Sequence, residues 1–444
     1  MTMYHHSLLV LAVIVLAFAA GKKLRLTTEL AMFAATLAAL AAHVLLPMGV
    51  DDRSTLSFTE IVRHVVEGAS TYLDVCLIFL TATFFMTLYK EAGGVAYIVR
   101  QIVRAFHAHR FICLILLCFV MLIPGAITGS GATAVLTVGA LVGAVLMAMG
   151  VPENKRVALV FLLAAMSAAC PPINLWAMMA AAGANMPYVG FSLPLAVLAI
   201  AGALFSTFYL AGRGKPVDLD KAMAELPEAP KGWNGFRAAL PFAVLILLII
   251  AGRVFPFSFP VVGLPLIFML AALVTLLVSP VRLKVLDVAS LTVRNLLGLV
   301  GIMVVVGILN QVMTLTGARG LLSLAVVTLP ITVLFATLWI ILPASEGVLQ
   351  YAVAPLLGVP LIMLFNMLGL DPVISLASWA VMWPVGDCLP PTAVVGRAAV
   401  MELNYKGRYY GGFVRTAIVP MLFILAACTA VMIFSKELAA IIGG

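Results

Sequence analysis

Four short polar segments interrupt an otherwise apolar sequence, and they hold the residues that could do chemistry. The first, residues 128–133 (TGSGAT), alternates glycine with hydroxyl-bearing residues. Glycine lets the backbone turn sharply, so carbonyl and hydroxyl oxygens there could surround a cation. The second, residues 167–174 (SAACPPIN), carries Pro171-Pro172 inside an apolar run. Two successive prolines remove two amide donors, so we expect an interrupted helix with free carbonyls and a new N-terminus.

The same two features recur later in the chain. Residues 343–347 (PASEG) place small and polar residues at an expected second turn, and residues 384–392 (PVGDCLPPT) break a later apolar run at Pro390-Pro391. A single Pro-Pro pair in a membrane helix is most often a kink. Two matched pairs of turn and break favour a functional site, because interrupted helices hold ions and substrates in transporters.

Two carboxylates lie inside these segments. Glu346 is at the expected second turn, and Asp387 precedes Pro390 by three residues. Carboxylates within a membrane are costly and usually functional, so we expect both to bind an ion, a proton or substrate. Asp74 and Glu29 lie nearer to expected helix ends, where a structural role is sufficient.

The composition places these segments in a membrane protein. Of 444 residues, 64% are hydrophobic and only 10% are charged, whereas a soluble protein has about a quarter charged residues. The chain is therefore predicted to be a multi-pass membrane protein, surrounded by the lipid bilayer, and the family resemblance given below implies the bacterial inner membrane. The formal charge of +8 is explained by basic cytoplasmic loops, so we expect no nucleic-acid partner.

The apolar runs predict the elements that position the polar segments. Two runs, near 111–150 and 320–368, are too long for one crossing and contain Gly, Pro and Ser in the middle, so each is predicted to be a re-entrant hairpin. Single spans are predicted near 7–21, 27–48, 71–89, 157–182, 190–210, 237–253, 260–279, 295–315, 373–396 and 412–434. The predicted fold class is all-α integral membrane, an inverted-repeat transporter with two re-entrant hairpins and two broken helices, and the family resemblance given below implies that it is of the elevator type.

The distribution of basic residues supports this layout. With the N-terminus outside, the cytoplasmic segments hold 21 of the 26 Lys and Arg, and the other five are Arg53, Arg63, Arg253, Arg319 and Lys436. The bias holds only if each hairpin reverses the chain. The two halves then have opposite orientations, as in inverted-repeat transporters.

The expected domain division follows the hairpins. Residues 1–110 would form scaffold helices and an interface arm, and residues 190–319 further scaffold helices and the cytoplasmic connector. Residues 111–189 and 320–396 would each supply one hairpin and one broken helix to a transport domain, and residues 397–444 a C-terminal helix.

Several motifs, in order along nearly the whole chain, resemble a known family. They are the helix and Gly-Gly arm at 72–106, PGAITGSGATAVLTVGA at 124–140, MGVPENKRVALVFLLAAMSAACPPINL at 149–175 and VAPLLGVPLIMLFNMLGLDPV at 353–373. In these the chain resembles the large membrane subunit of tripartite ATP-independent periplasmic (TRAP) transporters, within the wider ion transporter superfamily. The resemblance implies an elevator-type secondary transporter in which sodium binding drives uptake of a small organic acid.

The resemblance also implies partners and a coupling ion. A small membrane subunit and a periplasmic substrate-binding protein would complete the system, and sodium would be the coupling ion, with no other cofactor. The chain departs from the family at its second break, which is usually a neutral Thr-Pro-Pro run. Asp387 beside Glu346 would repel an organic anion, so we expect an additional cation, a proton, or a substrate other than a simple dicarboxylate.

These arguments assign the candidate site residues. Substrate contacts are expected at Thr128, Asn174, Glu346, Pro391 and Arg397, and sodium at Ser130, Ser167, Ser345 and Thr392. The full set expected to bind ions is Ser130, Gly131, Thr133, Ser167, Pro171, Ser345, Gly347, Asp387 and Thr392.

The leading functional hypothesis is sodium-coupled import of a small organic anion, with the chain as the large permease subunit of a TRAP-type system and no enzymatic activity. One alternative is a stand-alone ion-coupled organic-anion carrier or a sodium/proton antiporter of the same superfamily. Another is an intramembrane aspartyl-type hydrolase using Glu346 and Asp387, although no cleavage motif accompanies the pair.

Overall fold

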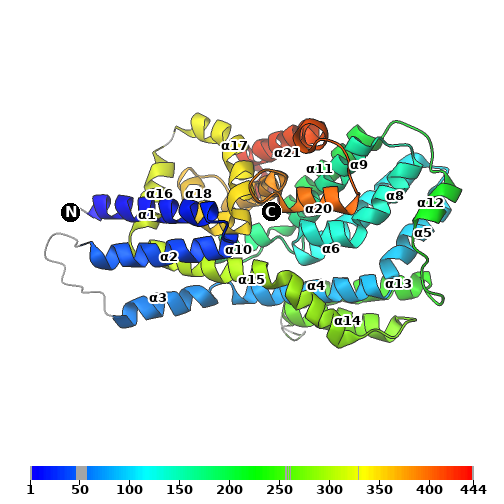
Figure 1. Cartoon of the computed structure of the whole chain (residues 1–444), viewed down its shortest axis with the longest axis horizontal. Helices are drawn as coiled ribbons and strands as arrows, with labels where there is room; N and C mark the ends of the chain where they lie inside the picture. Colours follow the sequence, from blue (N-terminus) through cyan, green and yellow to red (C-terminus); the bar gives the residue numbers. More distant parts are fainter. Residues whose placement is uncertain are drawn as a thin grey trace.

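The computed structural model describes residues 3–46, 58–255, 258, 260, 262–328 and 330–442, and within these ranges it contains helices and no β-strand. Many of the long helices run roughly along the long axis of the molecule (Figure 1). In the part of the chain so described, ten helices are long and apolar enough to cross a membrane. The predicted all-α, multi-pass membrane protein is thus confirmed.

One set of helices is assembled around α15 (Val285–Leu315), either in contact with it or joined to it through α2 and α4. Helix α15 contacts α2, α3 and α4 along its length, and α14 packs on α4 and α13. It starts ten residues before the predicted residue 295, because its first turns carry Asp287 and Arg294 beyond the purely apolar stretch. The other members are α1 (Met3–Lys23), α2 (Thr28–Leu45), α3 (Phe58–Ser70), α4 (Leu73–Glu91), α13 (Gly235–Val254) and α14 (Leu264–Val278).

The first predicted hairpin is present and turns at the Gly-Ser segment. Helix α6 (Arg110–Thr128) ends at Gly129, whose φ of +69° lies in the left-handed region that favours glycine. The chain then returns through α7 (Gly131–Ala134), the π-helix η1 (Val135–Gly139) and α8 (Ala140–Ala148).

The second hairpin is also present, but its turn lies later than predicted. Residues 343–347 lie inside α17 (Ile331–Leu349), and the chain reverses at Gln350, where φ is +55°. A proline within a membrane helix is tolerated where neighbouring groups satisfy the freed carbonyls, so Pro343 does not end the helix. The return arm consists of η2 (Gln350–Ala352), the π-helix η3 (Ala354–Gly358) and α18 (Val359–Met367), and the hairpin is preceded by α16 (Ala318–Val327).

Both predicted helix interruptions occur at the Pro-Pro pairs. Helix α9 (Glu153–Ala169) stops before Pro171, and α10 (Leu175–Gly183) starts after it. In the second half, α19 (Pro372–Met382) and η4 (Trp383–Gly386) stop before Pro390, and α20 (Val394–Glu402) follows. Helix α11 (Ser192–Ala211) packs on α9, α19 and α21 (Arg415–Ile433), which continues from η5 (Tyr409–Val414).

Three shorter helices complete the described structure: α5 (Gly94–Phe106), α12 (Leu219–Glu225) and α22 (Ser435–Ile442). Arg110, at the start of α6, is 7% exposed and organises the connector that contains α12. Its guanidinium donates to the carbonyl oxygens of Ala211 (2.6 Å), Arg213 (3.0 Å) and Met149 (3.2 Å), and also to that of Lys215. This cation is therefore a structural tie between the connector and the first hairpin.

The two hairpin and broken-helix units repeat the same local structure at a spacing of 219 residues, the difference between Pro171 and Pro390. Helix α8 (140–148) corresponds residue for residue to α18 (359–367), and η1 (135–139) to η3 (354–358). Backbone geometry repeats as well: φ is +71° at Gly150 and +72° at Gly369, and +56° at Asn185 and +50° at Asn404.

The two units are antiparallel. The start of α9 contacts the residues after α20, because Glu153 Oε1 accepts from the Lys406 amide (3.1 Å) and Asn154 Oδ1 accepts from the Tyr405 hydroxyl (2.6 Å). At the other end, a Cβ on Gly190, beyond α10, would lie 3.4 Å from Val373 at the start of α19. Each broken helix therefore starts where the other ends, which is the predicted inverted repeat.

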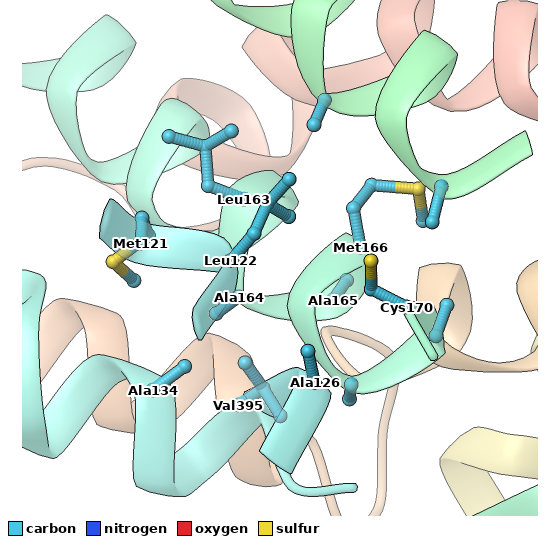
Figure 2. Packing of buried hydrophobic residues seen from close by; sticks show 14 of the residues in the cluster. Met121, Leu122, Ala126, Ala134, Leu163, Ala164, Ala165, Met166, Cys170 and Val395 are labelled. Atoms are coloured by element: carbon cyan, nitrogen blue, oxygen red, sulfur yellow. The ribbon is translucent and has the colours of Figure 1, made fainter. Parts of the chain in front are cut away.

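Small side chains let the hairpin and the broken helix of the first unit approach closely. Figure 2 shows Ala126 of α6 beside Ala164 and Ala165 of α9, with Met166 and Cys170 filling the adjoining space. A Cβ on Gly125 would overlap Ser167, so only glycine fits there.

Candidate functional site

The hairpins and the helix interruptions meet at one place in the fold. The amide of Ile173, after the first break, donates to the Ala126 carbonyl of hairpin one (3.0 Å). The amide of Thr392, after the second break, donates to the Gly347 carbonyl of hairpin two (3.1 Å). The Tyr351 hydroxyl, just past the second turn, donates to the Gly129 carbonyl at the first turn (3.3 Å). The two turns and the two breaks therefore converge in the fold.

In the first unit, the polar side chains mostly bond to the backbone. Ser167 is fully buried; its hydroxyl donates to the Leu122 carbonyl (2.7 Å) and accepts from the Gly125 amide (2.8 Å). Asn174 caps α10 by accepting from the Ala177 amide (2.9 Å), and it donates to the Ala169 carbonyl (3.0 Å). These bonds satisfy backbone groups around the first break, so Ser167 and Asn174 stabilise the interrupted helix in this conformation.

Thr128 and Ser130 lie at the first turn. Thr128 is fully buried and donates to the Pro124 carbonyl (2.7 Å), while Ser130 accepts from the Thr133 amide (3.3 Å) and thereby caps α7. Gly131 packs against the Ala164 carbonyl and Val395, where a Cβ would lie 3.0 Å from each. The first turn is thus in direct contact with the second broken helix.

The second unit contains the two carboxylates. Glu346 is fully buried near the end of α17, and its Oε2 accepts from the Trp176 indole nitrogen at 2.7 Å. Its Oε1 has no hydrogen-bond partner among the described residues. Asp387, 3% exposed, follows η4 in the second break. The backbones of these two segments touch, since a Cβ on Gly386 would overlap the Pro343 carbonyl.

The remaining predicted residues of the second unit surround this break. Thr392 donates to the Gly347 carbonyl (2.8 Å), and Arg397 donates to the Pro391 carbonyl (3.0 Å) from an exposed position on α20. Ser345 donates within its own helix to Leu342 (2.8 Å). The sodium positions predicted at Ser130, Ser167, Ser345 and Thr392 are thus distributed over both units, and their occupation stays a prediction.

A cavity of about 690 Å³ opens beside the meeting point. Of the predicted residues, it is lined by Ser130, Thr133, Asp387, Pro391, Thr392 and Arg397. Thr128, Ser167, Asn174 and Glu346 are buried and do not belong to its lining. Of the two predicted carboxylates, Asp387 therefore lines the cavity, whereas Glu346 is fully buried outside its lining.

The opposite wall and the mouth were not predicted as part of a site. They come from helices outside the repeat units: Lys22, Glu29, Lys90, Glu91, Asn295 and Leu296, joined by Glu402 of α20. The orientation predicted from the basic residues would place Lys22 and Lys90 at the cytoplasmic ends of their helices, and it therefore predicts that the cavity opens toward the cytoplasm. Trp176 and Tyr351 were also missed, although each lies within five residues of a predicted break or turn residue, and their rings pack 4.6 Å apart.

Comparison with known proteins identifies the fold. No protein-family model and no curated protein sequence matches the chain. The structure of MtrF from Neisseria gonorrhoeae, described as illuminating a class of antimetabolite efflux pumps, matches with a TM-score of 0.62 and 13% identity over 91% of this chain and 94% of that one. The YdaH transporter of Alcanivorax borkumensis, reported to have an unusual topology, matches with a TM-score of 0.63 and 14% identity over 97% and 98% of the two chains.

These matches correct the family named from sequence. Nearly full-length agreement with two other transporters shows that the chain is not a TRAP large subunit, so TRAP-type sodium-coupled import is wrong. The expected small membrane subunit and periplasmic substrate-binding protein are likewise wrong. The error arose because hairpins and Pro-Pro breaks at this spacing are shared by several inverted-repeat architectures. The chain is a multi-pass membrane protein with the fold of these two bacterial transporters.

Proposed function

We propose that the chain is a stand-alone secondary transporter of the bacterial inner membrane that exchanges protons for a small polar solute and moves the solute out of the cytoplasm. The observation that carries this proposal is a difference between the two repeat units. At the repeat spacing, Glu346 and Asp387 correspond to Ile127 and Ala168. Trp176, which donates to Glu346, corresponds to Val395. The fold is therefore built equally well with apolar side chains at the mirror positions, so the carboxylates are not needed for folding.

The surroundings of the two carboxylates support a role in proton binding. Of the ion pairs in the described part of the chain, none involves Glu346 or Asp387. A buried charge without a partner costs several kcal/mol, and two neighbouring carboxylates repel each other as well. A proton removes this cost with no change in packing, and the unpartnered Glu346 Oε1 is one position where it can bind.

The position of the cavity supports the direction and the coupling. Asp387 lines a space that can hold a small solute and that opens toward the basic, cytoplasmic ends of the helices. Solute and proton would then bind to the same movable unit, so that each changes the other's occupancy. The structural similarity to MtrF, described among antimetabolite efflux pumps, adds support for outward transport of a metabolite-like molecule.

The test uses proteoliposomes loaded with a pH-sensitive dye and containing the purified full-length chain. A panel of radiolabelled antimetabolites is offered under an imposed pH gradient, and proton movement and solute movement are recorded together. We expect at least one solute to move against its gradient with a simultaneous opposite proton flux. Glu346→Gln and Asp387→Asn should each reduce the proton-driven flux at least about tenfold.

Glu91→Gln is the matched control, because Glu91 lines the same cavity but lies at its mouth on α4. It should retain wild-type flux within about twofold. Solute transport that is unchanged in both carboxylate variants, or that proceeds with no proton movement, would refute the proposal.

A further inference from the structure

On the side opposite the cavity mouth, the end of the first broken helix is docked against the helices of the α15 set. Arg319, at the start of α16, donates to the Gly183 carbonyl at the end of α10 (2.8 Å) and to Thr314 Oγ1 (3.3 Å). A Cβ on Gly183 would lie 3.2 Å from the Tyr72 hydroxyl and 3.6 Å from Asn310 Nδ2. Close packing and a charge-assisted hydrogen bond thus close this side.

The inverted repeat identifies the mirror image of this docking point. At the spacing of 219 residues, Gly183 corresponds to Glu402 at the end of α20. The helices against which these two ends dock repeat at a different spacing, 224 residues. This spacing is the difference between Gly93 and Gly317, which have φ of +82° and +74° and directly precede α5 and α16. At that spacing Thr314, which accepts from Arg319, corresponds to Lys90, Tyr72 corresponds to Leu296, and Arg319 itself corresponds to the apolar Val95.

Lys90, Leu296 and Glu402 all line the open cavity. The contact at Gly183 is therefore formed in this conformation, whereas the symmetry-related position at Glu402 faces the open cavity. Because the end of α10 is docked while the end of α20 is not, the structure represents one of two symmetry-related arrangements.

We propose that Lys90 and Glu402 form an ion pair that closes the cytoplasmic side in the opposite conformation, in which the Arg319–Gly183 contact is open. This inference rests on the proposed transport function, since it requires the chain to alternate between two states. It gives a role to Lys90 and Glu402 at the cavity mouth, which take no part in the proposed proton binding.

Lys90 would act in both conformations by exchanging its acceptor. In this structure its Nζ donates to the Leu136 carbonyl in the π-helix of hairpin one (2.7 Å). When the unit moves and α20 approaches α4, the Glu402 carboxylate replaces that carbonyl. A carboxylate binds an ammonium more strongly than a carbonyl does, so this exchange of acceptor would stabilise the closed cytoplasmic side.

The test measures how fast a membrane-impermeant maleimide labels Leu136→Cys in inside-out membrane vesicles. Leu136 lines the cavity and is 49% exposed, and the six native cysteines, all buried, give the background in protein without the reporter. Arg319→Ala should stabilise the closed cytoplasmic side and slow labelling about threefold or more. Adding Glu402→Lys to Arg319→Ala should return labelling to at least the wild-type rate.

Two further variants make the result specific. Glu91→Lys, an identical charge change beside Lys90, should leave labelling in the Arg319→Ala background within about twofold. The swapped pair Lys90→Glu with Glu402→Lys in that background should slow labelling again relative to Glu402→Lys alone. Gel filtration of each variant confirms that it is folded.

The proposal is overturned if Glu402→Lys and Glu91→Lys give equal labelling, or if Arg319→Ala does not slow labelling. Because labelling needs neither solute nor proton movement, this outcome is independent of whether the proposed transport is observed.

Discussion

At the scale of single residues, Glu346 is the side chain whose placement demands most explanation. It is fully buried, and its one hydrogen bond comes from Trp176 of the other repeat unit. The bond therefore joins hairpin two to the broken helix of the first unit. We infer that a change in the protonation of Glu346 would alter its hydrogen bond to α10 directly. The far end of α10 is docked at Arg319.

Trp176→Phe tests whether this bond serves function as well as stability. Removing the indole donor and part of a buried side chain should lower the free energy of unfolding by about 2–4 kcal/mol, measured as a lower apparent Tm in detergent. Proton-driven solute flux should fall at least about tenfold, because Glu346 loses the group that holds it in place.

Trp233→Phe is the control for this prediction. Trp233 is also buried and donates to a carbonyl, that of Ala92 (2.8 Å), but it lies far along the chain from both breaks. It should lower the Tm by a similar amount and leave flux per folded molecule unchanged. Equal losses of flux in the two variants would show that the Glu346–Trp176 hydrogen bond has only a structural role.

At the scale of elements, each broken helix packs tightly on its hairpin, and glycine makes this possible. In the first unit the glycine is Gly125 on the hairpin, facing Ser167; in the second it is Gly386 on the broken helix, facing Pro343. The same close approach is thus obtained from opposite partners, and the backbone groups freed by the breaks find acceptors on the hairpins.

Gly125→Ala should destabilise the protein by about 1–3 kcal/mol or more, because the added methyl overlaps Ser167 and the buried helices cannot separate without losing their hydrogen bonds. The Tm in detergent measures the effect. Gly252→Ala in α13 is the matched control: nothing lies within 4 Å of its Cβ, so the change should be neutral or slightly stabilising. A Tm for Gly125→Ala equal to that of Gly252→Ala would show that the two helices are not closely packed there.

Much of the element pattern was predictable from local sequence. Pro-Pro pairs remove amide donors wherever they occur, so both interruptions could be placed to within a few residues. Gly129 likewise marked the first turn. The second turn was misplaced, because a single proline at 343 does not force a helix to end and Gln350 carries no turn-forming pattern.

At the scale of the whole molecule, the sequence identified the inverted arrangement but not the family. Motifs such as Gly-Ser turns and Pro-Pro breaks report local backbone geometry, which transporters of different families can share, whereas the overall fold depends on how all the helices pack. The cavity mouth was missed for the same reason: Lys90 and Glu402 belong to elements more than 300 residues apart and come together only through tertiary packing.

On the proposed mechanism, the Glu346–Asp387 pair carries a proton that the fold itself does not require. Infrared spectroscopy of the purified chain in lipid tests it most directly, because a protonated carboxylic acid has a carbonyl stretching band that a carboxylate lacks, and no solute is needed. We expect such a band at neutral pH, its loss in the Glu346→Gln, Asp387→Asn double variant and its retention in Glu91→Gln. A spectrum of the double variant identical to that of the wild type would contradict it.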